Sequence, residues 1–485
     1  MSSMNSLARL GRISVAVAAV VLAAGCSTSP SASSKAGGVA PPVVLQMGSA
    51  YGDLNGVPAV QYFVSQVEER SGGNLRVELK NNYGDNADDA EQLVVRAVAA
   101  GQTDLGWAGT RVFDTMGVAS FQALHAPMLV DSYPLEQAVI TAGIPLQMAQ
   151  DLDKIGVRSL AVLADGLRKP IGVKRPLLSP TDWQGITFGT FKSQGQAEAI
   201  KALGATPADV FGRSRTEALT AGKLQGFEMS LPVYDLQVLA QSAPYVTANV
   251  NLWPQMDALV ANPARFTRLS EQQKGWLEQA ARDASAHTTA SADQDASSLK
   301  NACQTGARFA NASKDELAAL QKAFRPVLAS LEKDAKTKAF IEQIQELKRT
   351  TPAGEPLSIP AQCTGKASEQ PDEKDGTVPS ALNGTYRYVL TKDDARKGGE
   401  RSLDDYPSVT TVTLRDGRVE GGCFDESATY WVNGKRITFN APAYGYTMTF
   451  DFSTDGKGNL HLTPVLPMDR GDAFVCSYKP WIKIS

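Results

Sequence analysis

Arg168 is the residue of this chain whose type and position point most directly to binding chemistry. It follows the apolar run Val157–Leu163, where a parallel sheet delivers side chains into a crevice at its edge. A guanidinium there offers a planar fork of donors that fits a carboxylate. The alternative is an arginine paired on a surface loop, since most arginines are exposed.

Four aromatic residues could line such a crevice. Trp107 ends a strand-like segment, and Phe191, Phe227 and Tyr234 follow Arg168 in the chain. Stacking on aromatic rings adds about 0.5–1.5 kcal/mol beyond burial, so an aromatic wall would favour an apolar or ring-shaped solute. Core packing is the alternative for each ring.

Catalytic and metal-binding patterns are not found in the sequence. The histidines, His125, His287 and His461, are widely separated, and the five cysteines have no metal-ligand spacing. No G-x-S-x-G, phosphate-binding glycine loop or H-E-x-x-H occurs. The net charge is −3 and no basic face stands out, which argues against nucleic acid as a partner. We therefore expect a protein that is not an enzyme and needs no cofactor or metal.

The first 26 residues have the composition of an export signal. Arg9 and Arg12 precede the apolar run Ile13–Leu22, which is too short to span a membrane. The segment L-A-A-G-C resembles a bacterial lipobox, which implies that Cys26 is lipidated; an ordinary signal peptide with a chance cysteine is the alternative. Residues 27–42 are rich in Ser, Pro and Gly, so we expect a tether between the cell membrane and the folded part.

Four further cysteines are available for disulfides in an oxidising compartment. Cys303 and Cys363 fall in one region, and Cys423 and Cys476 fall in the C-terminal region. Of the three connectivities we expect this domain-local pairing, because it is the simplest. Each bridge would contribute about 2–4 kcal/mol. Four free thiols are the alternative.

The elements that would position Arg168 alternate between strands and helices. Residues 43–109 follow the pattern strand, helix, strand, helix, strand, with glycines after each helix. Ala164–Glu228 continues with strand, strand, helix, strand, helix, strand. This alternation predicts a parallel sheet with helices on its faces. Capping-box patterns at Ser270 and Ser313 predict a helical second half.

Several motifs follow one another in this region: V-E-E-R-S-G-G-x-L-R-V-E, A-P-M-L-V-D, A-L-G-A-T-P-A-D-V-F and A-L-T-A-G-K-L-Q-G-F-E. Their order, from Val43 to Pro360, resembles that of the extracytoplasmic solute-binding component of TRAP transporters. The resemblance implies a two-lobed α/β, periplasmic-binding-protein-like (type II) fold for residues 43–363, which closes over a small-molecule solute by a hinge motion. It also implies TRAP-type membrane permease subunits as partners.

The resemblance also indicates candidate ligand-binding residues. Arg168 matches a family arginine that grips the solute carboxylate, and Glu228 matches a family glutamate, either structural or a hydrogen-bond acceptor. The second family arginine falls at Gly189 and the family asparagine at Met229. Another cation would have to replace that arginine, or the ligand differs. Candidates that could instead be surface charges are Lys192, Arg213 and Arg111.

The C-terminal region has a different pattern. Residues 364–380 have few large apolar side chains and are expected to form a linker. In residues 381–485, short alternating runs predict strands at Thr385–Leu390, Val409–Leu414, Tyr430–Val432, Arg436–Phe439, Tyr446–Phe452 and Leu460–Leu466. Asp-Gly and Asn-Gly pairs between them favour hairpins, which predicts a small antiparallel barrel or meander. Its opening N-G-T-Y faintly resembles a calycin or lipocalin-type barrel.

Together these features predict a lipid-anchored, extracytoplasmic solute-binding protein. We expect it to capture a small organic anion, a carboxylate, in an inter-lobe cleft and to deliver it to TRAP-type membrane subunits. The expected ligand contacts are Arg168, Trp107, Glu228, Phe191, Tyr234 and Lys192. The alternative is a ligand-sensing or adhesion lipoprotein that uses the binding fold for signalling; the incomplete arginine pair and the additional β domain favour it.

Overall fold

The computed structural model of the chain describes residues 41–485, apart from 53, 55–56, 238, 292, 368–375, 399–405, 423, 425–427, 442–445, 466–467 and 469. The predicted export signal, the lipidation site Cys26 and nearly all of the predicted tether lie outside the described residues. Among the helices that are described, none is long and apolar enough to cross a membrane.

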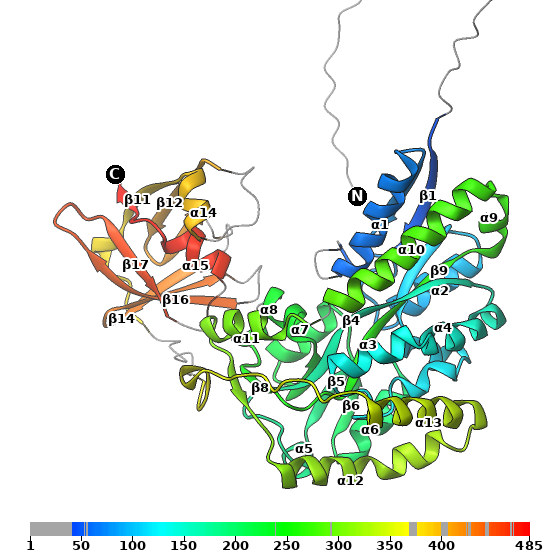
Figure 1. Cartoon of the computed structure of the whole chain (residues 1–485). Helices are drawn as coiled ribbons and strands as arrows, with labels where there is room; N and C mark the ends of the chain where they lie inside the picture. Colours follow the sequence, from blue (N-terminus) through cyan, green and yellow to red (C-terminus); the bar gives the residue numbers. More distant parts are fainter. Residues whose placement is uncertain are drawn as a thin grey trace, which may run out of the picture. The chain divides into compact units, whose positions relative to one another are not determined.

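The first lobe is built on a mixed sheet with the strand order β2-β1-β3-β9-β4 (Figure 1). β1 pairs in parallel with β2 and β3, whereas β9 runs antiparallel to both β3 and β4. The strands are β1 (Val43–Gly48), β2 (Leu75–Lys80), β3 (Leu105–Gly109), β4 (Arg158–Gly172) and β9 (Trp253–Ala261).

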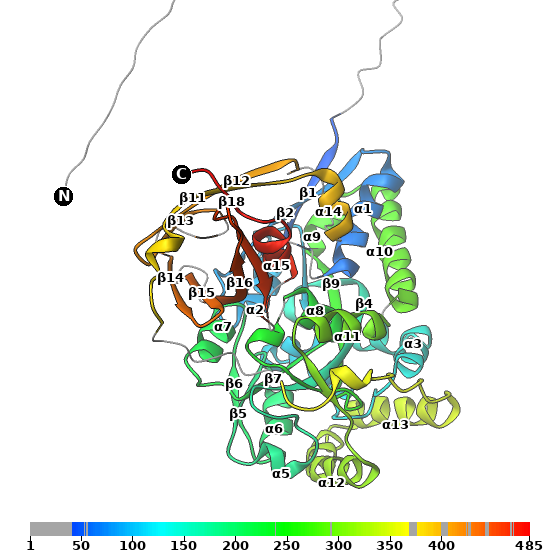
Figure 2. The ribbon, with the colours of Figure 1, turned by 90° about the vertical axis from the view of Figure 1, so that its left-hand side faces the viewer.

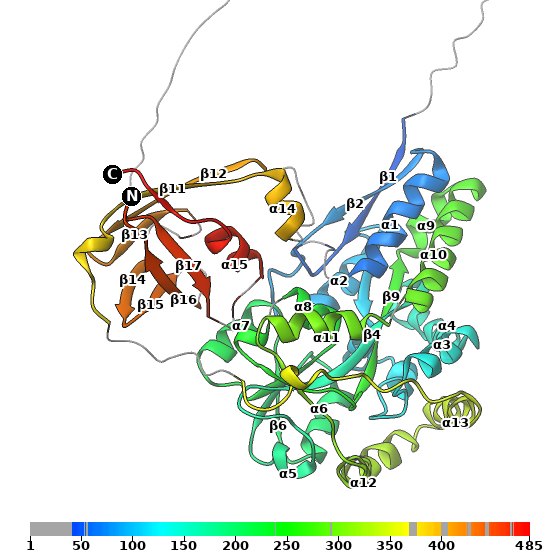
Figure 3. The same cartoon turned by 60° about the vertical axis from the view of Figure 1, so that its left-hand side comes forward.

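Helices cover both faces of this sheet. Helices α1 (Pro58–Ser71) and α10 (Glu271–Ser291) lie next to each other (Figure 3). They share one hydrophobic core with Leu45 and Trp107. Helix α2 (Ala90–Ala99) packs on the opposite face. Side chains alternate between the two faces along a strand, so neighbouring residues of β3 enter different cores.

The second lobe continues the sheet in the order β4-β7-β5-β6. β5 is parallel to β6 and β7, and β4 is antiparallel to β7. Its strands are β5 (Thr187–Thr190), β6 (Thr206–Asp209), β7 (Gly226–Met229), β8 (Tyr245–Thr247) and β10 (Arg308–Ala310). Its helices include α6 (Gln194–Ala202), α7 (Arg213–Thr220), α8 (Leu231–Leu236) and α11 (Asp295–Gln304). The predicted α/β periplasmic-binding-protein-like fold is thus confirmed.

Strand β4 belongs to both lobes and corrects one prediction. Sequence reasoning ended this strand at Leu163 and placed Arg168 beyond a parallel strand. In the structure the strand continues to Gly172 and its neighbours β9 and β7 are antiparallel to it. A bulge between Ala164 and Leu167, with Gly166 at φ 90°, accommodates the polar D-G-L-R-K stretch. Arg168 therefore lies where the strand passes from one lobe to the other.

The predicted helical second half is confirmed. Ser313 and Glu316 form a reciprocal capping box at the start of α12 (Lys314–Leu331). Ser270 and Gln273 do the same before α10. Helix α13 (Ala335–Thr350) buries Phe340, Ile341 and Ile344 in the core of the first lobe. These local caps satisfy backbone groups that a helix end leaves unpaired.

One predicted disulfide is confirmed. Cys303 at the end of α11 is bonded to Cys363, with the Cα atoms 5.4 Å apart. Cys476 is also disulfide-bonded. Its expected partner, Cys423, lies outside the described residues.

The C-terminal region forms an antiparallel sheet in the order β17-β16-β15-β14-β13-β12-β11-β18 (Figure 2). Backbone hydrogen bonds of 2.9 and 2.8 Å between Leu460 and Trp481 join its two ends, so the sheet is nearly closed into a barrel. Its strands are β11 (Gly384–Leu390), β12 (Ser408–Arg415), β13 (Arg418–Gly421), β14 (Thr429–Asn433), β15 (Arg436–Ala441), β16 (Tyr446–Thr454), β17 (Leu460–Pro464) and β18 (Ile482–Lys483).

The barrel confirms the predicted strands and adds elements that were not predicted. These are β13, β18 and the helices α14 (Lys392–Gly398) and α15 (Arg470–Ser477). Asp416 and Gly417 both have positive φ, as the predicted hairpin turn requires. Thr377 was expected in the linker, but it pairs with Val432 and so belongs to the barrel. The barrel has a core of its own, centred on the buried Trp481.

Candidate ligand-binding site

A cavity of about 390 Å³ lies between the two lobes. The first lobe and β4 contribute Ala50, Tyr51, Trp107, Gln255, Asp165 and Arg168, among others. The second lobe contributes Phe191, Phe211, Arg215, Met229, Val233, Leu236 and Gln237, among others. Strand β4, which belongs to both lobes, connects the two walls of the cavity.

Aromatic rings form one wall of the cavity. Tyr51 stacks on Trp107 with ring centroids 5.1 Å apart, and Phe211 meets the Tyr51 ring edge-on at 5.0 Å. Phe191 meets Phe211 edge-on at 6.1 Å. Of the four predicted rings, the structure therefore brings Trp107 and Phe191 to the cavity. Tyr51 and Phe211 were not predicted.

Tyr234 and Phe227 do not line this cavity. Both are buried in the core of the second lobe. The Tyr234 hydroxyl donates a hydrogen bond of 2.9 Å to the carbonyl of Ala243. For these two rings the core-packing alternative describes their position, because both belong to the hydrophobic core of the second lobe.

Arg168 lines the cavity, as predicted, but it is already paired. Its Nε donates to a carboxylate oxygen of Glu228, and its Nη2 donates to the Glu228 carbonyl at 3.1 Å. Both side chains are buried. The Arg168 guanidinium also lies 5.1 Å from the Phe191 ring centroid. Glu228 is therefore placed behind Arg168, as an acceptor that neutralises and orients it.

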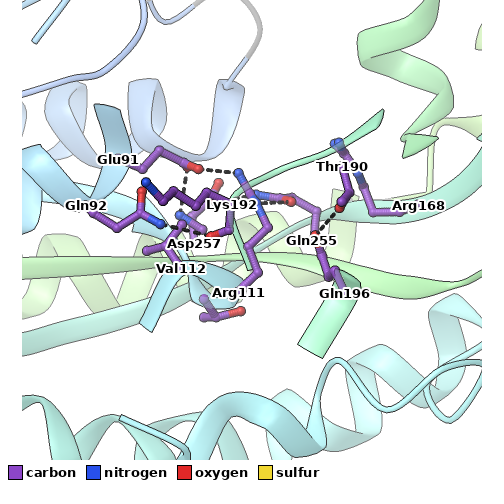
Figure 4. A network of polar contacts seen from close by, with 12 residues as sticks. Glu91, Gln92, Arg111, Val112, Arg168, Thr190, Lys192, Gln196, Gln255 and Asp257 are labelled. Atoms are coloured by element: carbon purple, nitrogen blue, oxygen red, sulfur yellow. Dashed lines mark hydrogen bonds and ion pairs between the residues drawn. The ribbon is translucent and has the colours of Figure 1, made fainter. Parts of the chain in front are cut away.

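Arg111 also contacts the ring of Phe191. Its guanidinium lies 3.8 Å from the ring centroid and donates to Glu91 at 2.5 Å and to Gln255 at 2.6 Å (Figure 4). Attraction between a cation and a π-face is strongest where water is excluded. Arg111 is almost completely buried and does not line the cavity.

The two other replacement cations lie outside the cavity. Lys192 is 43% exposed, with its Nζ 3.7 Å from Asp89. Arg213 is exposed at the start of α7. The space at Gly189 is closed to a side chain, because a Cβ there would lie 2.9 Å from both Leu224 Cδ2 and Val210 Cγ2.

Arg215 is a cavity-lining cation that sequence reasoning missed. It lies on α7 and is only 8% exposed. Its Nη2 donates to Gln237 Oε1 at 2.5 Å, while its Nε has no hydrogen-bond partner in the described structure. Burial, and then the neighbouring charge of Arg168, lower the pKa of Arg215 to about 10. A helical signal was present, since Arg215, Ala218 and Leu219 share one face by their i, i+3, i+4 spacing.

Two acids, the half-buried Asp165 and the buried Asp257, lie near these arginines. Asp165 lines the cavity, and burial followed by the charge of Asp257 raises its pKa well above the ordinary value. Burial likewise raises the pKa of Asp257 to about 7. Gln255 connects Arg111 to Asp257 (Figure 4). Its Oε1 accepts from Arg111, and its Nε2 donates to Asp257 at 2.7 Å. A protonated Asp165 can donate a hydrogen bond into the cavity.

Polar contacts join the lobes around the cavity. The Ser214 hydroxyl donates to Asp88 at 2.6 Å, and Gln92 donates to the Lys192 carbonyl at 2.9 Å. Gly195 at the start of α6 donates its backbone N–H to Asp114 at 2.8 Å. The arrangement can enclose a small molecule between aromatic rings, two guanidinium groups and an acid.

Comparison with known proteins agrees with this architecture. The sequence profile of DctP, described as bacterial extracellular solute-binding protein, family 7, matches residues 54–334. A solute-binding protein of Verminephrobacter eiseniae is 25% identical over 302 residues, which cover 62% of this chain and 88% of that protein. The C-terminal barrel lies beyond the family match.

Solved structures of low sequence identity share the fold. A TRAP periplasmic solute-binding protein of Ralstonia eutropha with bound (S)-2-acetolactate has a TM-score of 0.57 at 20% identity, covering 63% of this chain and 99% of that one. The sugar acid binding protein of Advenella mimigardefordensis with galactonate has a TM-score of 0.58 at 20% identity, covering 64% and 99%. A Bordetella pertussis receptor binding pyroglutamic acid has a TM-score of 0.57 at 17% identity, covering 63% and 100%.

Proposed function

Because the chain belongs to the DctP family of bacterial extracellular solute-binding proteins, we propose that it binds a small organic carboxylate in the cavity between its lobes. It would deliver this solute to the membrane subunits of a TRAP-type transporter. The observation that carries the proposal is the buried Arg168 on the cavity wall, held in place by Glu228. A guanidinium in a water-poor site binds a carboxylate through charge-assisted hydrogen bonds.

Ligands of the structural neighbours support this class of solute. Acetolactate, galactonate and pyroglutamic acid, bound by the three solved proteins above, each carry a carboxylate. The cavity of this chain has two guanidinium groups to meet such a group. Its aromatic wall would favour an apolar or ring-shaped body on that carboxylate.

Calorimetric titration of the chain from residue 27 onward against a carboxylate panel tests this proposal. We expect at least one carboxylate to bind, and Arg168→Ala to weaken that binding about 30-fold or more, because it removes a desolvated charged contact. Glu228 would also lose its partner in that variant, so Arg168→Lys serves as a control that retains the charge. Undiminished affinity in Arg168→Ala would contradict the proposed role.

Cys26 is the proposed attachment point to the outer face of the cell membrane. The support is the L-A-A-G-C segment and the polar residues after it. A single lipid chain gives only marginal membrane binding, so stable anchoring requires more than one acyl chain. We expect Cys26→Ser to remove lipid labelling of the protein and to release it from the membrane fraction.

The C-terminal barrel favours one alternative, a sensing or adhesion lipoprotein. It lies outside the family match, has a core of its own and is not needed to line the cavity. The neighbouring genes distinguish a transport function from a sensing function. Genes for two TRAP membrane subunits would support transport, and a gene for a sensor kinase would support signalling.

A further inference from the structure

Buried arginines of the site differ in whether the protein already neutralises them. Arg111 is paired with Glu91 and Arg168 with Glu228. Arg215 has no carboxylate partner among the described residues and lies against the cavity. We propose, on the basis of the function proposed above, that Arg215 is the main receptor of the solute's anionic group and that the site selects monocarboxylates with an apolar body.

The hydrogen bonding of Arg215 is incomplete among the described residues. Its Nη2 is engaged by Gln237, but Nε has no partner and the side chain is more than nine-tenths buried. The Phe227 ring supports the guanidinium from 5.7 Å. A buried charge without a counter-charge is costly, and a bound carboxylate would reduce that cost through charge-assisted hydrogen bonding.

The charges around the cavity favour one anionic group over two. Glu228 occupies Nε and one further donor of Arg168, which leaves that guanidinium as a secondary contact. A second solute carboxylate would approach Asp165, with Asp257 behind it. A second carboxylate beside Asp165 therefore costs either the repulsion of two like charges or the uptake of a proton.

Apolar side chains provide the remaining lining. They are the rings of Tyr51, Trp107, Phe191 and Phe211 together with Val57, Met229, Val233 and Leu236. A polyhydroxylated body would place hydroxyl groups against these side chains, where they would lose their hydrogen bonds to water. An aromatic or branched aliphatic body would instead gain from burial and ring stacking.

The test compares five probes by calorimetry on the chain from residue 27 onward: phenylacetate, 4-methylpentanoate, succinate, galactonate and the neutral phenylacetamide. We expect phenylacetate or 4-methylpentanoate to bind most tightly and phenylacetamide not to bind. Tighter binding of succinate or galactonate would overturn the proposed selectivity. Binding by none of the four carboxylates would overturn the proposed function itself.

Arg215→Gln tests whether Arg215 binds the anionic group of the solute. The matched control is Arg213→Gln, two residues away on the exposed side of α7. We expect Arg215→Gln to lower monocarboxylate affinity about 100-fold and Arg213→Gln to change it by less than about threefold. Equal affinities in the two variants would overturn the role of Arg215 and leave the proposed function standing.

Thermal unfolding of the ligand-free protein distinguishes a ligand-binding role of Arg215 from a structural role. Because Arg215 is buried and has no ion-pair partner among the described residues, we expect Arg215→Gln to raise the Tm of the ligand-free protein by about 2–4 °C. A structural arginine would give a lower Tm, and this result would overturn the inference. Arg215→Lys, which retains the charge but not the planar fork, is the second variant; we expect it to fold and to bind about tenfold more weakly.

Discussion

Arg168 and Arg215 line the same cavity but reach it by different routes. Arg168 lies on a long strand and its carboxylate partner Glu228 comes from the neighbouring strand. Arg215 lies on a short helix and is fixed by the amide of Gln237. Arg168 is thus already paired with a carboxylate of the protein, whereas the charge of Arg215 is available to a bound anion.

Glu136 of helix α3 (Tyr133–Thr141) gives a pH-dependent prediction at the residue scale. Burial, followed by the charges of Asp295 and Asp293, raises its pKa to about 8, and its Oε1 has no hydrogen-bond partner in the described structure. Between about pH 4.5 and 8 the folded chain holds a proton that the unfolded chain releases. The free energy of unfolding therefore falls as pH rises through this window.

Glu136→Gln removes this titration, so we expect a shallower fall of stability with pH and a more stable protein at pH 8. Urea unfolding at pH 5, 6.5 and 8 measures it. Asp257 and Asp165, whose pKa values are also raised, leave part of the slope in place. The exposed Glu346→Gln is the charge-matched control, and an identical slope in both variants would contradict the prediction.

Sequence reasoning at this scale found Arg168, Trp107 and Phe191 but missed Arg215. All three lie in or next to strand-like segments of the sequence, although the structure places Arg168 and Trp107 within β4 and β3 and only Phe191 just after a strand. Arg215 reaches the cavity because Ala218 and Leu219 of α7 pack against the core of the second lobe. That contact depends on the tertiary fold, which one arginine in a short polar helix does not indicate.

Strand β4 gives a prediction at the scale of the element. Gly166 has φ 90°, and a Cβ there would lie 3.3 Å from Ser230 Cβ and 3.5 Å from Tyr133 Oη. Gly166→Ala should destabilise the fold by about 1–2 kcal/mol because L-residues disfavour this backbone conformation. It should also shift Arg168, two residues away, and weaken carboxylate binding about tenfold or more through loss of a charge-assisted hydrogen bond.

Gly185→Ala is the matched control for this effect. Gly185 has φ 72°, and a Cβ there would meet nothing within 4 Å. We expect a similar loss of stability by urea unfolding but unchanged affinity by calorimetry. A loss of affinity in both variants would show that general destabilisation, not the position of Arg168, is responsible.

Elements whose signals are local were predicted well, and those that depend on distant partners were not. The capping boxes at Ser270 and Ser313 and the turn at Asp416 lie within a few residues of chain. The continuation of β4 through a glycine and a buried lysine requires β9, β7 and the pairing of Lys169 with Asp295. None of these partners is visible in the strand's own composition.

At the scale of the whole molecule, we predict that the barrel is dispensable for binding. The residues that line the cavity fall between Ala50 and Gln255, and the barrel core contains only barrel residues. Truncation after Ala367 should leave carboxylate affinity within about threefold of the longer chain, as expected for separate domains. A larger loss by calorimetry would mean that the barrel takes part in binding.

The sequence also indicated how the whole chain divides. Alternation at a period of two distinguished the barrel from the helix-rich region before it, because strand faces differ in burial. The closing contact of the barrel was not predicted, since Trp481 pairs with Leu460 outside any regular strand pattern. The predicted linker included Thr377, because nothing in the type of this residue indicates that it pairs with Val432.

The position of β9 has a consequence for the order of events as the chain is made. This strand lies between β3 and β4 in space but follows β5, β6 and β7 in the chain. A chain that emerges N-terminus first therefore cannot complete the first lobe until the second has emerged, and the inner edges of β3 and β4 stay open meanwhile. Open edges favour aggregation. The two lobes must mature together, and any factor that protects the nascent protein would have to act until Ala261 is available.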